Sequence, residues 1–480
     1  MYEKFGQFIN GKWQKSSGGE TYDVINPATE EVIGKASKAN KKDIDQCLKS
    51  AEEGFKIWKN TSPWERSKII RKISDLIRKR KDILSKWLTL EVGKPLAESL
   101  GEVNGSADIF EWSAEEAKRI YGETLQGRSL NTKIHVYYQP VGVVAALVPW
   151  NFPITLASRK ISTALSAGCS VIVKPDVITP GAVMELVDIC NEAGVPPGVV
   201  NLLSGDPAYI SDQLLSSNII KKVSITGSTR VGKLILKKAA EKIQRVTMEL
   251  SGHSPFIVFD DVDLNKVTDI AIFAKFRNNG QVCISPSRFY IHESKKNDFT
   301  NLMVKKTKEL KIGNGMEKST ILGPLTTKKR LEEIEALVET TKKEGAKILC
   351  GGKKPADFNK GYFFEPTVFD NIKDNYTIMN QEPFGPLVPI LSFKDFDEVI
   401  DRANNNDLGL ASYIYTNNLE KAHKASEMME TGTVAVNTGV VALPEAPFGG
   451  IKQTGYGREG GSMAIKDYLN IKYTHLGISN

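Results

Sequence analysis

Cys283 is the side chain whose type and neighbours best suit a nucleophile. It follows Gly280-Gln281-Val282, in a stretch of small and polar residues where a thiol can be accessible. The chain has five cysteines, widely spaced and without a Cys-x-x-Cys pair, which indicates neither a disulfide framework nor a zinc site. A lone free cysteine is more often a buried structural residue, and a thiolate needs surroundings that lower its pKa. Both interpretations stay open for the residue taken alone.

Two acidic positions could supply a base. Glu249 stands between Met248 and Leu250 at the end of a strand-like run. A partly desolvated carboxylate there has a raised pKa, which suits a general base near neutral pH. Glu382 opens a second rigid acidic turn, Glu-Pro-Phe-Gly-Pro at 382–386. For each carboxylate the alternative is a salt bridge at the edge of the fold.

Two strand ends are suited to phosphate or ribose groups. Gly227 begins a near match to a P-loop, but Leu234 stands where that motif needs Ser or Thr, which argues against a kinase or ATPase. A glycine at a strand-to-helix turn still exposes N–H groups that suit a pyrophosphate, unless the turn is only structural. Lys174 ends another strand and could hold a ribose or a phosphate, or could simply be solvated.

Strand-like and helical segments alternate from residue 141 to 250, which is typical of a parallel, doubly wound α/β sheet. Ligands bind such sheets beyond the carboxyl ends of the strands, so Lys174 and Gly227 are expected at one ligand-binding edge. The predicted strands are 141–148, 170–173, 199–203, 222–226 and 245–250. The predicted helices are 154–167, 180–193, 206–216 and 228–240.

A second α/β run follows Gly252, which places a domain boundary near residue 250. Its predicted strands are 255–259, 288–292, 347–350, 362–368 and 387–392, and its predicted helices are 263–279, 296–311 and 328–344.

The ends of the chain have their own patterns. Residues 7–34 are predicted to form short strands and turns, and apolar periodicity predicts helices within 42–91 and over 98–121. Ser62-Pro63 is a good helix start, with a serine cap and a proline in the first turn. The segments 131–140 and 460–480 are strand-like. A terminal strand of this kind often pairs with another subunit or domain.

Composition narrows the class of protein. The chain has 41% hydrophobic and 25% charged residues and a formal charge of +7. Its basic residues are scattered, unlike a nucleic-acid-binding surface. No apolar run approaches 18 residues, and the first residues form no signal peptide, so neither membrane insertion nor export is predicted. With its cysteine usage, this predicts a cytoplasmic protein that binds no nucleic acid, no membrane and no metal.

Seven motifs together resemble the NAD(P)-dependent aldehyde dehydrogenase superfamily. They occur in the same order as in that superfamily, and the resemblance covers essentially the whole chain. They are PWNFP at 149–153, VKP at 173–175, TGST at 226–229, MELSG at 248–252, NNGQVC at 278–283, EPFGP at 382–386 and PFGGIKQTGYGREGG at 447–461.

The resemblance implies an α/β fold with two Rossmann-like doubly wound domains and a small β oligomerisation extension. Residues 1–122 and 141–250 would form the dinucleotide-binding domain, and 251–440 the catalytic domain with the nucleophilic cysteine. Residues 123–140 and 460–480 would form the oligomerisation segment of a homodimer or homotetramer.

The resemblance also implies the chemistry. Cys283 would attack the aldehyde carbon, and Asn151 with the Cys283 backbone N–H would form the oxyanion hole. Hydride transfer would leave a thioester, for whose irreversible hydrolysis Glu249 would activate water. The presence of Glu249 favours hydrolysis over acyl transfer to coenzyme A.

The implied cofactor residues lie in the same motifs. Lys174 would hold the adenosine ribose, Ser228 beside Gly227 would meet the pyrophosphate, and Glu382 would hold the nicotinamide ribose. The remaining predicted cofactor residues are Pro149, Trp150, Val177 and Phe384. Val177 replaces a glutamate that is common in NAD-preferring members and would repel a 2′-phosphate, so NADP is predicted to be accepted and preferred over NAD.

Arg159 and Arg277 match positions at which succinate semialdehyde dehydrogenases bind the distal carboxylate of their substrate, although each could instead be part of a structural ion pair. Ser285 replaces a second cysteine found in many of those enzymes, and residues 440–444 lack a serine that helps hold the carboxylate. The motifs look closer to the 2,5-dioxopentanoate (α-ketoglutarate semialdehyde) branch. The predicted substrate is therefore a semialdehyde acid, 2,5-dioxopentanoate or succinate semialdehyde, bound with the help of Arg159, Arg277 and Ser285. The alternative is a broad-specificity enzyme for neutral aliphatic, aromatic or hydroxy aldehydes.

Overall fold

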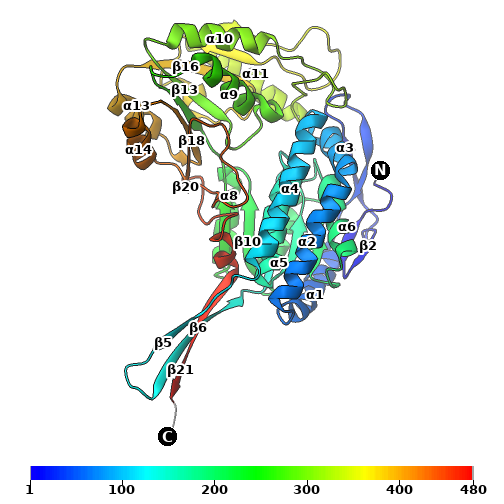
Figure 1. Ribbon diagram of the computed structural model, residues 1–480. Coiled ribbons are helices and arrows are strands. Elements are labelled where there is room, and N and C mark those ends of the chain that lie inside the picture. Colours follow the sequence, from blue (N-terminus) through cyan, green and yellow to red (C-terminus); the bar gives the residue numbers. More distant parts are fainter. Residues whose placement is uncertain (1, 478–480) are drawn as a thin grey trace.

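Two seven-stranded sheets and a projecting three-stranded arm make up the protein, whose computed structural model describes residues 2–477 (Figure 1). The first sheet lies in the N-terminal half of the chain and the second in the C-terminal half. The predicted α/β architecture, with two doubly wound sheets and a small β extension, is confirmed. No helix among residues 2–477 is long and apolar enough to cross a membrane.

The first sheet is parallel except at one edge. Its strand order is β11-β10-β7-β8-β9-β1-β2, and the β1–β2 hairpin joins β9 antiparallel. Its strands are β1 (Gln7–Ile9), β2 (Lys12–Gln14), β7 (Val143–Leu147), β8 (Ser170–Lys174), β9 (Val200–Leu202), β10 (Ile220–Thr226) and β11 (Arg245–Glu249). The β3 (Thr21–Ile25) and β4 (Val32–Ser37) strands form a separate hairpin.

Alternating apolar side chains let helices cover both faces of this sheet. On β7, Val144 and Ala146 face one core and Val143, Ala145 and Leu147 face the other. The first core is closed by α2 (Pro63–Lys79), α3 (Lys81–Val92), α4 (Leu96–Glu116), α5 (Pro153–Ala167) and α6 (Gly181–Ala193). The second is closed by α1 (Lys41–Trp58), α7 (Pro207–Ser216) and α8 (Thr229–Ala240).

The second sheet repeats this plan with an antiparallel edge strand, β14. Its order is β14-β15-β16-β13-β12-β18-β19. Its strands are β12 (Ser254–Val258), β13 (Pro286–His292), β14 (Lys347–Cys350), β15 (Thr367–Asp370), β16 (Leu387–Phe393), β18 (Ala411–Tyr415) and β19 (Thr433–Val436). One face packs on α9 (Leu264–Phe276) and α10 (Lys296–Lys308). The other packs on α11 (Lys328–Lys343), α12 (Thr377–Asn380), α13 (Phe396–Asn404) and α14 (Leu419–Met428).

The chain returns from the second sheet to the edge of the first. The backbone N–H of Met248 donates to the Tyr456 carbonyl at 2.9 Å, and that of Leu250 donates to the Thr454 carbonyl at 2.8 Å. These bonds cover the outer side of β11. The short β17 (Leu408–Gly409) and β20 (Ile451–Lys452) pair on the same path. Residues 451–456 therefore connect the two domains instead of belonging to one of them.

The arm consists of β5 (Glu123–Gln126), β6 (Thr132–Pro140) and β21 (Leu469–Gly477), and it projects away from both sheets (Figure 1). The strand predicted in 460–480 is β21, preceded by the 3₁₀ turn η2 (Ala464–Tyr468), and it pairs antiparallel with β6 of the same chain. Residues 478–480 of that predicted segment lie outside the described residues.

Several predicted bounds differ from the structure. The region 42–91 holds three helices, of which α2 begins after Ser62 as predicted, with the Ser62 hydroxyl accepting from the Glu65 N–H at 3.2 Å. The strand predicted over 362–368 begins only at Thr367, because Phe364 packs into the core without joining a sheet. The helix predicted over 263–279 ends at Phe276, since Asn278 and Asn279 adopt left-handed backbone angles. Asparagine tolerates that conformation better than most residues, and a helix cannot continue through it.

Candidate active site

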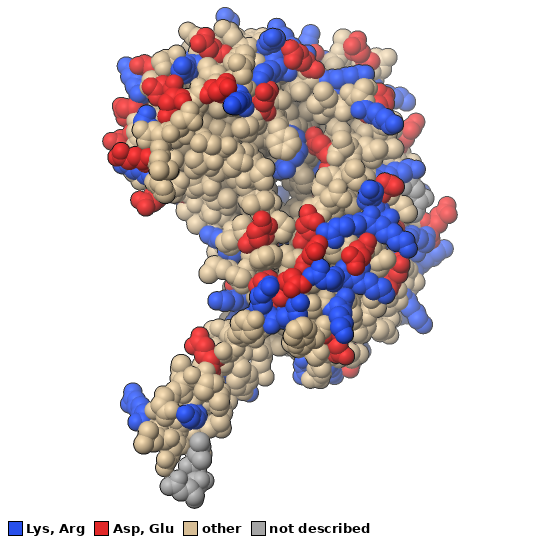
Figure 2. Space-filling model, in the orientation of Figure 1, with Lys and Arg blue, Asp and Glu red and all other residues tan. Residues whose placement is uncertain are grey.

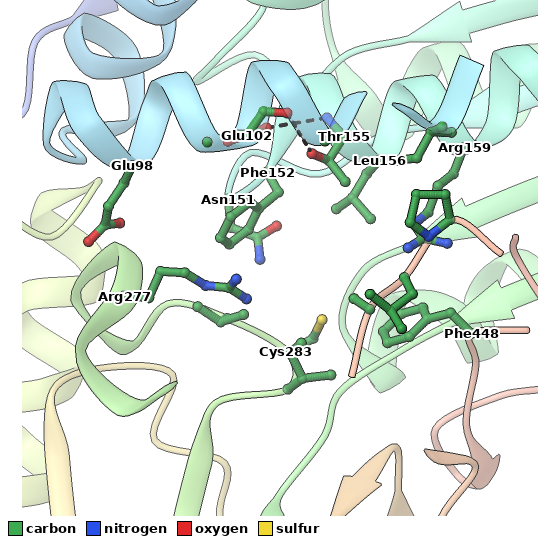
Figure 3. A pocket seen from close by; sticks show the side chains of 18 of the residues that line it. Glu98, Glu102, Asn151, Phe152, Thr155, Leu156, Arg159, Arg277, Cys283 and Phe448 are labelled. Carbon is green, nitrogen blue, oxygen red and sulfur yellow. Dashed lines mark hydrogen bonds between the residues drawn. The ribbon is translucent and has the colours of Figure 1, made fainter. Parts of the chain in front are cut away.

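A cavity of about 610 Å³ lies between the two sheet domains, and Cys283 is part of its wall. Figure 2 shows the molecule hollowed on this face, and Figure 3 shows the Cys283 sulfur pointing into the cavity between Arg277 and Arg159. The wall is formed by α4, the start of α5, the segment 277–284 and the segment 442–448. Both domains and the connecting segment thus contribute to one space.

A strained turn places the thiol. The φ angles of Asn278, Asn279 and Gly280 are +48°, +56° and +72°, three consecutive residues in the left-handed region. A Cβ on Gly280 would lie 2.2 Å from the Gly385 carbonyl oxygen, so only glycine fits there. The Asn279 side-chain amide donates to the Gly323 carbonyl at 2.9 Å, and this bond fixes the turn to another loop of the second domain. Strain maintained by surrounding contacts is typical of a functional loop.

The Cys283 thiol is free and half-buried. Burial raises its pKa well above the usual range, the Glu249 carboxylate raises it further, and Arg277 opposes the shift only weakly. The surroundings in this structure therefore favour the protonated thiol. A nucleophilic role requires a base close by.

Glu249 is a buried carboxylate that lies beside the thiol. It ends β11, is 2% exposed, and receives no hydrogen bond from an N–H or O–H group of residues 2–477. Burial raises the pKa of its carboxyl, while the Cys283 thiol beside it lowers that pKa to a smaller extent. The buried Lys160 ammonium, which contacts Glu459 at 2.5 Å and Thr226 at 2.7 Å, also lowers it. Glu249 and Cys283 therefore lie together, although 34 positions of sequence, 249 to 283, separate them.

Asn151 follows β7 at the other side of the thiol. It is 4% exposed, and its side-chain amide donates to the Gln281 carbonyl at 3.2 Å. Its own backbone carbonyl accepts from Asn278 Nδ2 at 3.0 Å and from Lys94 Nζ at 2.8 Å. The residue thus joins the end of the first sheet to the turn that carries Cys283.

Arg159 and Arg277 both line the cavity. Arg159 is 3% exposed, donates to the Glu459 carbonyl at 3.3 Å and lies 5.1 Å from the Phe448 ring centre. Burial lowers the pKa of Arg159. Arg277 lies 5.3 Å from the Phe152 ring centre, and its buried Nε has no hydrogen-bond partner within residues 2–477. Neither guanidinium forms an ion pair with a described residue.

Ser285 is not brought to the cavity. The chain turns after the thiol, with the Ser285 N–H donating to the Val282 carbonyl at 2.9 Å. The Ser285 hydroxyl then donates to the Lys275 carbonyl at 3.2 Å, toward α9. The residue is absent from the described cavity wall, to which Val282, Cys283 and Ile284 belong. The sequence prediction of a direct substrate contact by Ser285 is thus not supported by its position.

The predicted cofactor residues lie at strand ends of the first sheet. Lys174 ends β8, is buried, and forms no ion pair within residues 2–477; burial lowers the pKa of its amine. Gly227 follows β10, and a Cβ added to it would meet nothing within 4 Å. The Ser228 hydroxyl accepts from the Val231 N–H at 3.3 Å and so caps α8. The open space beside this helix start fits a phosphate group.

A second set of predicted cofactor residues lies between the domains. The Glu382 carboxylate accepts from the Gly252 N–H at 3.2 Å, and burial raises the pKa of Glu382 to about 7. Phe384, at φ +44°, packs edge-on against Trp150 at 5.5 Å between ring centres. Pro149 precedes Trp150 at the end of β7 and is half-buried.

Val177 lies in the loop after β8 and is half-buried. The neighbouring Asp176 carboxylate accepts from the Ile178 N–H at 3.0 Å, so it is turned into its own loop. The side chain at position 177 itself carries no charge.

The fold and site define the class of protein: a two-domain α/β protein in which a thiol, a carboxylate and an amide surround one point beside the carboxyl edge of a parallel sheet. Comparison with known proteins identifies the family. Residues 13–474 match the aldehyde dehydrogenase family, to which the chain belongs.

The relatives are similar over nearly their whole length. The chain is 40% identical to a glutarate-semialdehyde dehydrogenase of Pseudomonas putida, over 98% of this chain and 97% of that one. It is 39% identical to the NADP(+) succinate-semialdehyde dehydrogenase GabD of Escherichia coli, again over 98% and 97%. A crystal structure of an NADP-dependent enzyme from E. coli superposes with a TM-score of 0.97 at 38% identity, covering 99% of both chains. The predicted family and NAD(P)-dependent enzyme class are confirmed.

Four residues of the site were not among those predicted from the sequence. Phe152 and Phe448 form cavity walls under the two arginines, and Lys94 with Glu102 forms a fully buried ion pair at 2.6 Å behind Asn151. The two aromatic residues lie inside motifs of the family, Phe152 in 149–153 next to Asn151 and Phe448 in 447–461. Lys94 and Glu102 gave no local signal, because a lysine and a glutamate near a helix start are usually solvent-exposed.

Proposed function

We propose that the protein oxidises a semialdehyde acid irreversibly to the corresponding dicarboxylate, with NADP or NAD as hydride acceptor. The observation that carries this proposal is the pair Arg159 and Arg277, two guanidiniums without an ion-pair partner in residues 2–477 that line the same cavity as Cys283. Arg159 is buried and Arg277 half-buried, and a buried cation without an ion-pair partner is costly, so a carboxylate bound between them would compensate for that cost. The names of the P. putida and E. coli relatives, which act on glutarate and succinate semialdehyde, agree with this substrate class.

The residues around the thiol suit each step of the reaction. Cys283 Sγ adds to the aldehyde carbon and gives up its proton to Glu249, the carboxylate beside it. The resulting oxyanion accepts hydrogen bonds from Asn151 Nδ2 and the Cys283 backbone N–H. When bound, the nicotinamide cofactor supplies the acceptor for the aldehyde hydride, which leaves a thioester on Cys283. Glu249, after losing this first proton to solvent, takes a proton from a water molecule whose hydroxide adds to the thioester carbon. The C–S bond then breaks, the acid leaves, and the Cys283 thiolate recovers a proton from Glu249.

The structure also supports binding of the cofactor by the predicted residues. Lys174 presents an amine without an ion-pair partner among the described residues at the carboxyl end of β8, and the space beside Gly227 is open. Ser228 would sit by the pyrophosphate, Glu382 by the nicotinamide ribose, and Pro149, Trp150 and Phe384 would line the path between them. We propose that NADP is preferred, because Val177 offers no charge against a 2′-phosphate. In this proposal residues 1–122 and 141–250 bind the dinucleotide and 251–440 supply the nucleophile.

The two arginines could hold the distal carboxylate of 2,5-dioxopentanoate or succinate semialdehyde, the leading substrates. Guanidiniums bind carboxylates through paired, charge-assisted hydrogen bonds. The same cavity has apolar walls, including Phe152, Leu156 and Phe448. This apolar lining supports the second candidate function, a broad-specificity dehydrogenase for neutral aldehydes.

A substrate panel separates the two functions. Purified protein would be assayed for NADPH and NADH formation with 2,5-dioxopentanoate, succinate semialdehyde, glutarate semialdehyde, butanal and benzaldehyde. The expected result is a kcat/KM at least about 10-fold higher for the semialdehyde acids, which corresponds to about 1.4 kcal/mol of added transition-state binding. Equal kcat/KM values for butanal and the acids would favour the broad-specificity enzyme.

The arm supports a homo-oligomer, as a dimer or tetramer of this chain. Leu130 is 91% exposed, Ile471 70% and Tyr473 69%, so the arm presents large apolar side chains to solvent. Apolar surface of this kind typically marks an interaction site. Light scattering coupled to size-exclusion chromatography would test the proposal, and a monomer at micromolar concentration would contradict it.

All five cysteines are free, which supports the further proposal of a cytoplasmic location.

A further inference from the structure

The link between α3 and α4 brings a lysine behind the active site. Gly93 ends α3 with φ +94°, and the Leu96 N–H donates to the Gly315 carbonyl at 2.9 Å. A Cβ on Gly315 would lie 2.5 Å from the Lys94 carbonyl oxygen, and one on Gly323 would lie 2.0 Å from that of Gly93. The second domain therefore packs directly on this link, which fixes the backbone of Lys94.

The Lys94 ammonium is fully buried and has three partners. It donates to Glu102 Oε2 at 2.6 Å and to the Asn151 carbonyl oxygen at 2.8 Å, and it lies 3.7 Å from the Phe152 ring centre. Burial lowers the pKa of Lys94, whereas Glu102 raises it. A buried ion pair is weak evidence of a stabilising role, because desolvation offsets the attraction. The hydrogen bond from the Lys94 ammonium to the Asn151 carbonyl oxygen indicates instead that the pair holds the Asn151 peptide.

Glu102 extends the contact to the next residues. Its Oε1 accepts from the Ile154 N–H at 3.2 Å and from the Thr155 N–H at 3.3 Å. These belong to the first turn of α5, which has no side-chain cap of its own from Phe152. A carboxylate at a helix N-terminus satisfies these donors and interacts favourably with the helix dipole. Figure 3 shows the Glu102 contact to Thr155 above Asn151 and Phe152.

Asn151 is thus held from both domains. Lys94 Nζ and Asn278 Nδ2 donate to the same Asn151 carbonyl oxygen, at 2.8 and 3.0 Å. The Asn151 side-chain amide reaches the Gln281 carbonyl, two residues before the nucleophile, at 3.2 Å. An oxyanion donor must lie within about 2.7–3.1 Å of the developing charge, so a small displacement of this peptide weakens it.

We infer that Lys94, with Glu102, is a positioning residue that holds the Asn151 amide in place for the oxyanion. The inference rests on the oxyanion role of Asn151 in the proposed function. Lys94 acts through the Asn151 peptide and touches neither substrate nor cofactor. If Lys94 had a purely structural role, replacing it would lower the stability of the protein without a specific decrease in kcat.

The test compares Lys94→Met with Lys222→Met in the full-length protein. Lys222 is the matched control, a buried lysine that donates to Thr247 and lies 4.6 Å from the Tyr468 ring centre, outside the cavity wall. Lys94→Met is expected to lower kcat for butanal about 10- to 100-fold, less than the 10²–10³-fold typical of losing an oxyanion donor, with KM changed less than about threefold. Lys222→Met is expected to keep kcat within about twofold while lowering Tm comparably.

A double-mutant cycle distinguishes positioning from structure. Lys94→Met combined with Asn151→Ala is expected to have the kcat of Asn151→Ala alone, because Lys94 acts through Asn151. Multiplicative effects, or a Lys94→Met enzyme as active as the Lys222→Met control, would overturn the inference. Wild-type kcat in Asn151→Ala would instead refute the oxyanion assignment of the proposed function. Glu102→Gln, which keeps the shape of the pair, is the second variant if Lys94→Met does not fold. It is expected to lower kcat at least about threefold with the same non-additivity, and full activity would count against the inference.

Discussion

The Glu249 carboxylate and the Cys283 thiol lie side by side in a buried site, and each changes the pKa of the other. Glu249 raises the pKa of the thiol, and the thiol lowers that of the carboxyl, although burial leaves both above their usual ranges. The pair thus starts as a protonated thiol next to a carboxylate of enhanced basicity. In the proposed mechanism, proton transfer between them produces the nucleophile.

This relationship predicts the effect of Glu249→Gln on turnover. The variant lacks the base for thioester hydrolysis, so kcat is expected to fall about 10²- to 10⁴-fold, the usual range for a general base. The proposed mechanism also uses Glu249 to deprotonate Cys283, so rapid-quench mass spectrometry with succinate semialdehyde and NADP tells the two steps apart. An acyl adduct accumulates on Cys283 if thioester hydrolysis is slowed more than acylation, and none accumulates if acylation is slowed more. A Glu249→Gln enzyme that turns over normally would exclude Glu249 as the hydrolytic base.

The same pair predicts an acid limb in the pH profile. Because the pKa of Glu249 is raised, its basic form is lost as the pH falls while still above the usual carboxyl range. The kcat of the wild-type enzyme is therefore expected to increase with pH through mildly acidic conditions. Iodoacetamide labelling of Cys283, followed by peptide mass spectrometry, should show the same limb, and Glu249→Gln should slow labelling at pH 7. Faster labelling in that variant would mean that Glu249 acts on the thiol only through its charge.

The part of the site that follows from sheet geometry was predictable. In the structure Lys174 and Glu249 are the last residues of β8 and β11, and Gly227 directly follows β10, all in one parallel part of the first sheet. A chain that alternates strands and helices brings the carboxyl ends of its parallel strands to one edge of the sheet, whatever residues form the connections. The confirmed family assignment came from seven motifs, three of which, at 173–175, 226–229 and 248–252, contain these strand ends.

The positions that depend on the path of a loop were not predictable in the same way. The helix expected through 263–279 stops at Phe276, because Glu98 accepts from the Asn278 N–H at 2.7 Å and the second domain holds the left-handed turn. Two residues after Cys283 the chain has already turned, so Ser285 faces α9. Lys94 lies 57 positions from Asn151, and only tertiary packing brings them together. No local pattern in the sequence carries such a contact.

Arg277 is expected to select substrates by charge. Arg277→Ala should raise KM for succinate semialdehyde roughly 10- to 100-fold, since hydrogen bonds to a charged group contribute about 1.5–3 kcal/mol. KM for butanal should remain nearly unchanged and serves as the internal control. Arg277→Lys keeps the charge but not the planar guanidinium, so its KM for succinate semialdehyde should lie between those of the wild type and Arg277→Ala. Equal increases for both substrates would remove the carboxylate-binding role.

Arg159 should behave differently from Arg277, because it is also part of the fold. Its guanidinium donates to the Glu459 carbonyl, and a Cβ on Gly460 would lie 2.7 Å from it. Arg159→Ala is therefore expected to raise KM for the semialdehyde acid and also to lower Tm by several degrees, as removal of a buried hydrogen-bonded group usually does. Differential scanning fluorimetry of both variants checks this, and an unchanged Tm in Arg159→Ala would contradict the structural part of its role.

Val177 is expected to set the choice between the two cofactors. Val177→Glu places a carboxylate in the loop after β8, near the Lys174 amine that is proposed to hold the adenosine ribose. Repulsion of a 2′-phosphate should lower kcat/KM for NADP at least about 10-fold, while kcat/KM for NAD should change little or increase. Val177→Gln, similar in size but uncharged, is the control and should retain NADP. A wild-type enzyme that strongly prefers NAD would contradict the proposed preference, and an unaltered cofactor ratio in Val177→Glu would place the 2′-position elsewhere.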